Sequence, residues 1–297
     1  MSGEPLSAWD RFWRYDRISS FHSAPGAANY GPPIADGWSA FFAALPDRAR
    51  ILDLCTGNGA IAVMAVAAGK SFAVTGADLA DVEPTAFVTR NLDHLKQVTF
   101  LARTPAEKLP LADGGIHAVV SQYGIEYSDL ARSLPEAVRV LAPGGRLRLA
   151  MHATEGTVAR DTRTAIADAE FLLGLDLVAR AAEAESDGPT AFNAALKAIA
   201  DRAPTATDQA MLANVHRSLC DTFDHRRPAL AATAELLVSE IRAHHDRQSA
   251  LLAAAQSLDA MHRLAARLVS VGMAEVIHTE QRDGADLIGH VIEARRP

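Results

Sequence analysis

Short apolar stretches alternate with helix-like stretches over residues 50–152. The apolar stretches are 50–55, 72–79, 98–102, 116–121 and 145–152, and helices are expected at 60–68 and from near Pro135 to Leu141. Near-continuous apolar strands joined by helices are typical of a parallel sheet that is covered on both faces. The pattern therefore predicts a doubly wound α/β core.

The apolar spacing becomes helical after residue 155. Positions that recur with this spacing are Met211, Val215, Leu219 and Phe223, and then Leu258, Met261, Leu264, Leu268 and Val271. Breaks at Gly188-Pro189, Pro204 and Pro228 predict four or five helices. Two strand-like stretches, 274–280 and 287–294, then flank a turn at 282–284 and predict a hairpin.

Because strands return after the helical stretch, we expect the helices to be inserted into the α/β domain. The alternative is a separate C-terminal helical domain that ends in a hairpin. The pattern predicts four segments: an N-terminal helical and loop lid at 1–46, a Rossmann-like core at 47–154, a helical insertion at 155–256, and the last core helix with the hairpin at 257–297.

Composition narrows the classes of partner. The 297 residues are 49% hydrophobic and 22% charged, with a formal net charge of −7, which argues against a nucleic-acid partner. Two distant cysteines, Cys55 and Cys220, suggest a reduced intracellular protein. Residues 1–17 lack the apolar region of a signal peptide, and the most apolar window, 60–69, is too short to span a bilayer. We therefore expect a cytoplasmic protein with no membrane partner.

The stretch "ILDLCTGNGAIA" at 51–62 is an apolar strand, a glycine-rich turn and the start of a helix. Gly57, Gly59 and Ala62 fit a loose dinucleotide-binding pattern, with Asp78 about twenty positions later. Such glycines let any ligand approach the backbone, so they do not distinguish between cofactors. Asp53 does distinguish between cofactors. A carboxylate inside the strand would repel a pyrophosphate, whereas it suits a cofactor that is cationic at this point.

The same stretch resembles motif I of the class I S-adenosylmethionine-dependent methyltransferases, hydrophobic-Leu-Asp-Leu-x-x-Gly-x-Gly. "VTGADL", "AEKLPLADGGIHAVVSQYGIEY" and "VLAPGGRLRL" resemble later elements of the family, in the family's order, the last as a turn before the fifth strand. The resemblance covers roughly 50–151 and 258–295. It implies a mostly parallel seven-stranded sheet with an antiparallel seventh strand, and an enzyme that converts S-adenosyl-L-methionine to S-adenosyl-L-homocysteine.

The resemblance also implies which residues bind the cofactor. Asp53 would orient the methionine ammonium and Asp78 would bind the ribose hydroxyls. Pro105 occupies the position where many relatives carry an acidic residue that binds the adenine amino group. The adenine would therefore be bound by the backbone near Ala106. Glu107 is either a cofactor ligand or a solvent-facing turn residue. The implied cofactor-binding residues are Asp53, Cys55, Gly57, Asn58, Gly59, Asp78, Leu79, Ala106, Glu107, Gln122 and Tyr123.

In this family the acceptor binds beyond the carboxyl ends of the fourth and fifth strands, which points to residues 121–129. Nucleic-acid and protein-amide methyltransferases of the family commonly carry Asn/Asp-Pro-Pro-Tyr here, whereas this chain has Gln-Tyr-Gly-Ile. That difference and the acidic balance favour a small-molecule acceptor, bulky or partly hydrophobic. An acceptor hydroxyl or protonated amine needs a general base, for which the candidates are His152, Glu126 and His22.

Aromatic residues are the expected walls of the acceptor pocket. They are Tyr15, Tyr30, Trp38 and Tyr127, and the alternative is that they pack the N-terminal helix on the sheet. The histidines lack metal-ligand spacing, so no metal is expected. The helical insertion would serve as a substrate cap or as the interface of a homodimer. The alternative functions are a protein methyltransferase, a non-catalytic S-adenosylmethionine-binding regulator, and a nicotinamide-dependent oxidoreductase.

Overall fold

The computed structural model describes residues 7–20, 29–32, 34–225 and 227–297. The chain divides into two compact units, which we call the α/β unit (Met1–Val158 with Ala254–Pro297) and the helical unit (Ala159–Ala253). In the sequence, the helical unit follows the fifth strand and precedes the last helix of the α/β unit. The helices between the fifth and sixth strands are therefore an insertion, as the returning strands predicted.

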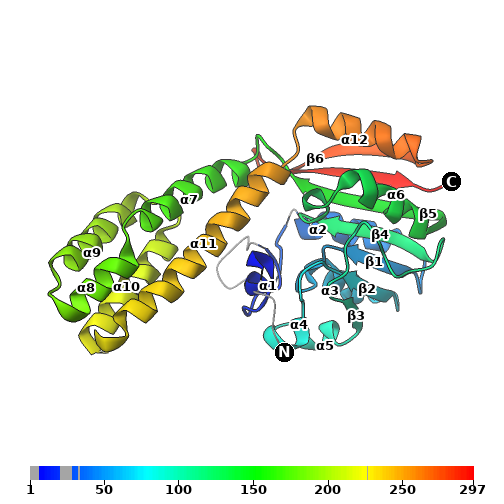
Figure 1. Cartoon of the computed structure of the whole chain (residues 1–297). Helices are drawn as coiled ribbons and strands as arrows, with labels where there is room; N and C mark the ends of the chain where they lie inside the picture. Colours follow the sequence, from blue (N-terminus) through cyan, green and yellow to red (C-terminus); the bar gives the residue numbers. More distant parts are fainter. Residues whose placement is uncertain (1–6, 21–28, 33, 226) are drawn as a thin grey trace. The chain divides into compact units, whose positions relative to one another are not determined.

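Seven strands form one sheet in the described part of the α/β unit, in the order β3-β2-β1-β4-β5-β7-β6 (Figure 1). Neighbouring strands from β3 to β5 are parallel, whereas β7 is antiparallel to both β5 and β6. The strands are β1 (Arg50–Leu54), β2 (Ala73–Ala77), β3 (Val98–Leu101), β4 (Ile116–Gln122), β5 (Leu141–His152), β6 (Ala274–Asp283) and β7 (Asp286–Arg295). The predicted Rossmann-like sheet and its terminal hairpin are confirmed.

Helices cover both faces of this sheet. Ile51 packs on the face beneath α2 (Ile34–Ala43) and α3 (Ala60–Ala67), because successive strand residues point to opposite faces. Leu52 packs on the other face, beneath α6 (Leu130–Val140) and α12 (Leu258–Ser270). Figure 1 shows α12, in orange, along β6 and β7. The remaining short helices of this unit are α1 (Ala8–Trp13), α4 (Pro84–Phe87) and α5 (Leu92–Leu95).

Helix α6 begins before the position that the sequence suggested. The Asp129 side chain accepts the backbone N–H of Ala131 and caps the helix, so Pro135 lies inside the helix and not at its start. Proline has no N–H with which to bond the carbonyl four residues earlier. That carbonyl, of Ala131, accepts a hydrogen bond of 2.9 Å from the Arg267 guanidinium on α12. A tertiary contact thus supplies a donor that the local sequence lacks.

Strand β5 also begins earlier than expected. The "LAPGG" stretch, expected as a turn before the strand, belongs to β5. Residue Ile116 of β4 pairs with Leu141, but Ala118 pairs with Arg146, so the extra residues of β5 form a bulge. Gly144 has φ of +76°, a conformation that glycine adopts readily, and this explains how the strand continues through the irregularity.

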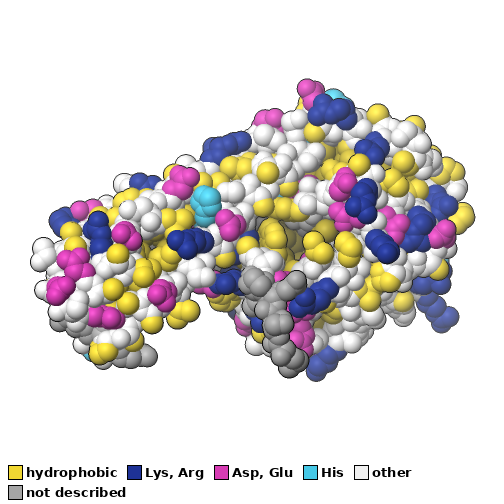
Figure 2. Space-filling view, in the orientation of Figure 1, with side chains coloured by type: hydrophobic (Ala, Val, Ile, Leu, Met, Phe, Trp, Pro, Cys, Tyr) yellow, Lys and Arg dark blue, Asp and Glu magenta, His cyan; other side chains and the backbone are white. Residues whose placement is uncertain are grey.

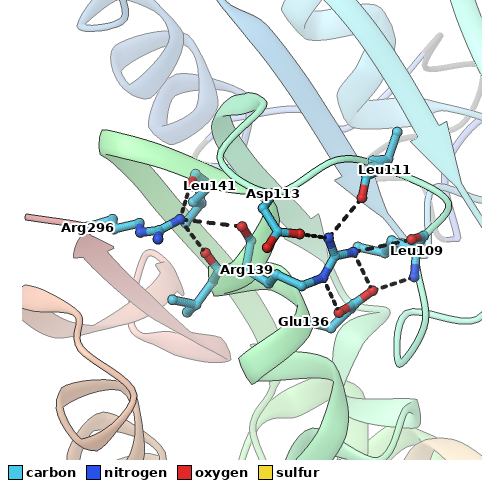
Figure 3. Close-up of polar contacts among 8 residues, drawn as sticks. Leu109, Leu111, Asp113, Glu136, Arg139, Leu141 and Arg296 are labelled. Carbon is cyan, nitrogen blue, oxygen red and sulfur yellow. Dashed lines mark hydrogen bonds and ion pairs between the residues drawn. The ribbon is translucent and has the colours of Figure 1, made fainter.

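Arg139 and Arg296 form hydrogen bonds with several chain segments around the start of β5 (Figure 3). Arg139 donates to Glu136, to the carbonyls of Leu109 and Leu111, and to Asp113. Its guanidinium therefore ties the segment before β4 to helix α6. Figure 3 also shows Arg296 bonded to carbonyls at the end of α6, among them that of Leu141, where helical backbone groups lack internal partners.

Replacing Arg139 with alanine should lower the free energy of unfolding by about 2 kcal/mol, since several charge-assisted hydrogen bonds are lost together. Urea titration followed by circular dichroism measures the change. Arg132→Ala is the matched control, because Arg132 is exposed on the same helix and should shift stability by less than about 0.5 kcal/mol. Equal midpoints for the two variants would contradict the structural role of Arg139.

The helical unit has a core of its own. Its helices are α7 (Thr157–Leu173), α8 (Leu177–Ser186), α9 (Thr190–Arg202), α10 (Gln209–His225) and α11 (Leu230–Ala254), of which α7 and α11 extend one or two residues beyond the unit. Buried side chains from all five helices form one cluster, which includes Leu172, Phe192 and Leu219. The predicted breaks at Gly188-Pro189, Pro204 and Pro228 lie between helices. A further break, which the apolar spacing did not predict, follows Gly174, where Asp176 has φ of +50°.

Charges of both signs are mixed on the protein surface that Figure 2 shows, with Lys and Arg lying among Asp and Glu. The net negative charge is therefore not concentrated in one region of that face. Among the helices of the described ranges, none combines the length and apolar character that crossing a bilayer requires.

Candidate active site

The carboxyl ends of β1 and β4 meet where the strand order of the sheet reverses. Open α/β sheets bind ligands at such a switch point. The chain leaves β1 at Cys55, with φ of +55°, and leaves β4 at Tyr123, with φ of +56°. Non-glycine residues rarely adopt this left-handed conformation, and they cluster at functional sites. The backbone thus marks both edges of the candidate site.

The glycine turn after β1 is closely covered by another side chain. Gly57 has φ of +52°, and a Cβ atom placed on it would lie 2.4 Å from the Trp13 ring. Gly59, with φ of +85°, precedes the first residue of α3. Only glycine at position 57 permits the approach of an aromatic ring to the backbone, which is the property expected of a ligand-binding turn.

Two buried carboxylates flank this turn. Asp53 is 2% exposed and accepts a 2.6 Å hydrogen bond from the Thr56 hydroxyl. Asp78 accepts the backbone N–H groups of Gly57 at 2.7 Å and Ala80 at 2.8 Å. Burial raises the pKa of Asp53 to about 7 and that of Asp78 to about 6, and the hydrogen bonds oppose this rise. A ligand with positive charge would stabilise both in their ionised forms.

Helix α1 and the chain after it lie over the turn. The Asn58 amide donates to the backbone carbonyls of Trp13 at 2.9 Å and Arg17 at 2.7 Å. The ring of Trp9 stacks on that of Trp13, with centroids 6.3 Å apart. Asn58, predicted as a cofactor ligand, therefore holds the N-terminal segment with its nitrogen. Its Oδ1 atom is buried and has no hydrogen-bond partner among the described residues.

A small cavity of about 20 Å³ lies under this cover. Its lining residues are Trp13, Ile18, Ser20, Tyr30, Asp53, Cys55, Thr56, Ala60, Ile61, Gln122 and Tyr123. Five of these, Tyr30, Asp53, Cys55, Gln122 and Tyr123, were predicted as site residues. The volume suits about one water molecule, so α1 has to move before a nucleoside-sized ligand can reach Gly57.

A buried carboxylate–imidazole pair lies at the carboxyl ends of β4 and β5. His152 Nδ1 is 2.8 Å from Glu126 Oε1, and the side chains are 3% and 0% exposed. The backbone N–H of His152 donates to the same oxygen at 3.0 Å. When Glu126 accepts a hydrogen bond from Nδ1–H, the Nε2 atom of the neutral imidazole carries a lone pair that can accept a proton. Glu126 Oε2 is buried without a hydrogen-bond partner in the described part of the chain.

Two tyrosines pack against this imidazole. The Tyr123 ring stacks on His152 with centroids 4.3 Å apart and an interplanar angle of 25°. Tyr127 meets His152 edge-on at 6.3 Å and also contacts Trp9 of α1 at 5.3 Å. The N-terminal helix, the predicted acceptor segment and the candidate base are therefore in contact within the α/β unit.

Other predicted residues lie at the margins of this site. Leu79 is 69% exposed and Tyr15 is 49% exposed, whereas Trp38 is fully buried beneath the sheet. Trp38 contacts the site through its indole N–H, which donates a hydrogen bond of 2.6 Å to Oε1 of the cavity-lining Gln122. Glu107 accepts the backbone N–H of Asp129, just before α6. Ala106 packs in the core below α6, and His22 lies outside the described residues; the roles assigned to all of these remain predictions.

Thr56, Trp13 and Gln281 are among the site residues that were missed from the sequence. Thr56 follows Asp53 closely, so a hydroxyl within reach of a strand-end carboxylate was a usable signal. Trp13 belongs to an aromatic N-terminal stretch in which nothing distinguishes it from Trp9 or Phe12. Gln281, which accepts a hydrogen bond from the Tyr123 hydroxyl, lies in the terminal hairpin more than a hundred residues from the motifs, and no sequence signal identifies it.

Residues 51–145 match a family described as "Methyltransferase domain". An uncharacterised methyltransferase of Mycobacterium bovis is 37% identical over 145 residues, which are 46% of this chain and 53% of that protein. A demethylmenaquinone methyltransferase of Thermus thermophilus is 40% identical over 101 residues, 33% of this chain and 44% of that protein. The chain thus spans about half the length of the curated relatives it matches.

Solved structures of methyltransferases are similar at lower identity. The 1,6-didemethyltoxoflavin-N1-methyltransferase of Burkholderia thailandensis is 14% identical with a TM-score of 0.45, covering 89% of this chain and 78% of that one. A Thermotoga maritima S-adenosylmethionine-dependent methyltransferase is 15% identical with a TM-score of 0.41, covering 88% and 87%.

Proposed function

We propose that this protein is a class I S-adenosylmethionine-dependent methyltransferase that methylates a small-molecule acceptor at the carboxyl ends of β4 and β5, and the match of residues 51–145 to a methyltransferase domain supports the proposal. The observation that supports the proposal most strongly is the buried Glu126–His152 pair beside the cofactor turn. A family domain alone would suit a regulator as well, but a buried, oriented imidazole next to the turn is suited to proton removal.

The residues of the turn fit S-adenosylmethionine. Gly57 provides a cradle that a larger residue would fill, and the buried carboxylates of Asp53 and Asp78 suit a cationic nucleoside with free hydroxyls. We assign Asp53 to the methionine ammonium and Asp78 to the ribose. When bound, the cofactor supplies a methyl group on a sulfonium, an electrophile that needs alignment and exclusion of water more than acid catalysis.

His152 and Glu126 have complementary tasks in this proposal. Glu126 accepts a hydrogen bond from Nδ1–H and fixes the tautomer, so that Nε2 takes the proton from an acceptor hydroxyl or amine as the methyl group is transferred. The cofactor, held by Asp53 and Asp78, would supply the methyl carbon to the acceptor's electron pair and would keep the electron pair of its carbon–sulfur bond on sulfur. The imidazolium that results is stabilised by the adjacent carboxylate.

A small-molecule acceptor is supported by two observations. The site is lined with buried aromatic rings, of which Tyr30 and Tyr123 meet edge-on at 6.5 Å. Several matched relatives are named for small substrates, including the demethylmenaquinone and the ubiquinone/menaquinone C-methyltransferases. We propose an acceptor with an aromatic or other apolar body and an acidic hydroxyl or amine.

The test is a methyl-transfer screen with radiolabelled S-adenosylmethionine. Purified protein is incubated separately with extracted metabolites and with lysate proteins, and calorimetry measures binding of S-adenosylmethionine and of NAD. Label in the metabolite fraction only is the expected result. Label in proteins would indicate a protein methyltransferase, cofactor binding without any transfer would indicate a regulator, and binding of NAD alone would exclude the proposal.

Binding of S-adenosylmethionine should weaken as the pH falls. A cationic cofactor favours the ionised form of Asp53, whose pKa is raised by burial to about 7 in the free protein. Protons must then be released on binding, and the dissociation constant should rise about tenfold from pH 7.5 to pH 6. Calorimetry in buffers of different ionisation enthalpy measures this release directly. Asp53→Asn should flatten the dependence, and an unchanged slope in that variant would contradict the assignment.

The other parts of the proposal concern location and assembly. A cytoplasmic location, the absence of a nucleic-acid partner and the use of the helical unit as substrate cap or dimer interface stay predictions. Size-exclusion chromatography with light scattering tests the dimer.

A further inference from the structure

Tyr123 is fixed at the end of β4 by contacts on several sides. Its backbone N–H donates to the Ala150 carbonyl at 2.7 Å, and its ring stacks on His152. Its hydroxyl donates to Gln281 Oε1 at 2.5 Å. The ring that covers one face of the candidate base therefore takes its position from a residue on β6, two strands beyond β5.

The sheet leaves space for this ring at Gly289 of β7. A Cβ atom at position 289 would lie 2.8 Å from Tyr123 Cε1 and 3.0 Å from its hydroxyl oxygen. Gly289 pairs with His152 on one side and with Gln281 on the other. The absence of a side chain between these two residues thus allows Tyr123 to reach from the base to the glutamine.

Gln281 is buried in a strand whose other residues are mostly exposed or partly exposed. It is 6% exposed, and its Oε1 accepts both the Tyr123 hydroxyl and, at 3.3 Å, the Gln122 amide. Gln122 in turn accepts the indole N–H of Trp38. Burying an amide is costly unless it is hydrogen-bonded, and here the carbonyl oxygen joins α2, β4 and β6 in one polar chain.

We infer that Gln281 is a positioning residue for the candidate base, acting through Tyr123. Glu126 selects the tautomer of His152 through its hydrogen bond with Nδ1. Tyr123 fixes the plane of the same imidazole ring by stacking on it, and Gln281 and Gly289 keep Tyr123 in that position. This role of Gln281 rests on the proposed function, because it concerns how the His152 Nε2 atom is oriented toward the acceptor.

The test compares His152 in the whole protein and in variants by NMR with labelled histidine. The His152 ring signals are assigned from their absence in His152→Gln. In Gln281→Leu we expect the ring-proton signals of His152 to lose the upfield shift caused by the stacked Tyr123, and Gly289→Ala should displace them in the same direction. Gln281→Glu, which keeps an acceptor oxygen, should restore the wild-type signals, and Thr279→Ala, exposed on the same strand, should not change them.

Kinetics with an acceptor from the screen provide the second measurement. Gln281→Leu should lower kcat roughly 10- to 100-fold with little change in KM, as expected when a reacting group is misaligned. Wild-type His152 signals in both Gln281→Leu and Gly289→Ala would overturn the inference. Full activity in His152→Gln would instead overturn the proposed base, whatever the NMR signals of the Gln281 variants show.

Discussion

Replacing His152 with glutamine is expected to lower kcat by at least about 100-fold, because an amide cannot accept the acceptor's proton at neutral pH. The side chain is 3% exposed and bonded to Glu126, so the variant must be shown to fold. Glutamine keeps a polar group near Glu126, which limits the loss of stability. The measurement is initial rate against pH, with the acceptor from the metabolite screen and saturating S-adenosylmethionine.

The dependence of the initial rate on pH distinguishes a general base at position 152 from a structural histidine. The wild-type rate should fall at acidic pH, and this acidic limb should be absent from the residual rate of His152→Gln. Glu126→Gln should also lower kcat, because an amide at this position no longer selects the tautomer with Nε2 free. His262→Gln, at an exposed position on α12, is the control. An unchanged kcat in His152→Gln would exclude the general-base role.

Replacing Asp78 with asparagine is expected to raise the dissociation constant of S-adenosylmethionine about 100-fold, or about 2.7 kcal/mol, through the loss of charge-assisted bonds to the ribose. Calorimetry at pH 7.5 measures the change. Asp93→Asn, at an exposed position after β2, should bind as the wild type does. Wild-type affinity in Asp78→Asn would mean that the cofactor site has been placed wrongly.

The stability of the same variant shows whether the loss reflects binding or folding. Burial raises the pKa of Asp78 from 3.8 to about 6 in the folded protein, so the unfolded chain loses its proton first as the pH rises. The ionised carboxylate therefore lowers the stability of the cofactor-free protein progressively between about pH 4 and pH 6. The amide of the Asp78→Asn variant cannot ionise, but its single oxygen can accept only one of the two backbone N–H groups, of Gly57 and Ala80, that the carboxylate accepts. The two effects oppose each other, so the Tm at pH 7.5 should stay within a few degrees of that of the wild type.

Some boundaries could not be read from the sequence because distant residues set them. Pro135 resembled a helix start, yet α6 begins at Leu130 because Asp129 caps it and Arg267 of α12 bonds the Ala131 carbonyl. The "LAPGG" stretch resembled a turn, yet pairing with β4 keeps it in β5 as a bulge. In both cases local residue preference was overridden by contacts made across the sheet.

The candidate site divides in the same way. Asp53, Gly57 and Asp78 were identified from the sequence, because a strand, a turn and the next strand end lie close along the chain. Glu126 and His152 were both candidates, but only the fold places their side chains 2.8 Å apart. Trp13 and Gln281 reach the site from the N-terminal helix and the terminal hairpin. The residues next to them in the sequence therefore do not indicate that they belong to the site.

By itself the sequence predicted the fold class, the insertion of helices between the fifth and sixth strands, and the cofactor that we propose. These follow from periodic burial and from one contiguous motif, which are local properties of a chain. The tertiary structure alone decided that Glu126 orients His152, that α1 covers the glycine turn, and that Gln281 holds Tyr123 on the imidazole. Those arrangements depend on side-chain contacts between elements far apart in sequence, which a pattern of residue types does not specify.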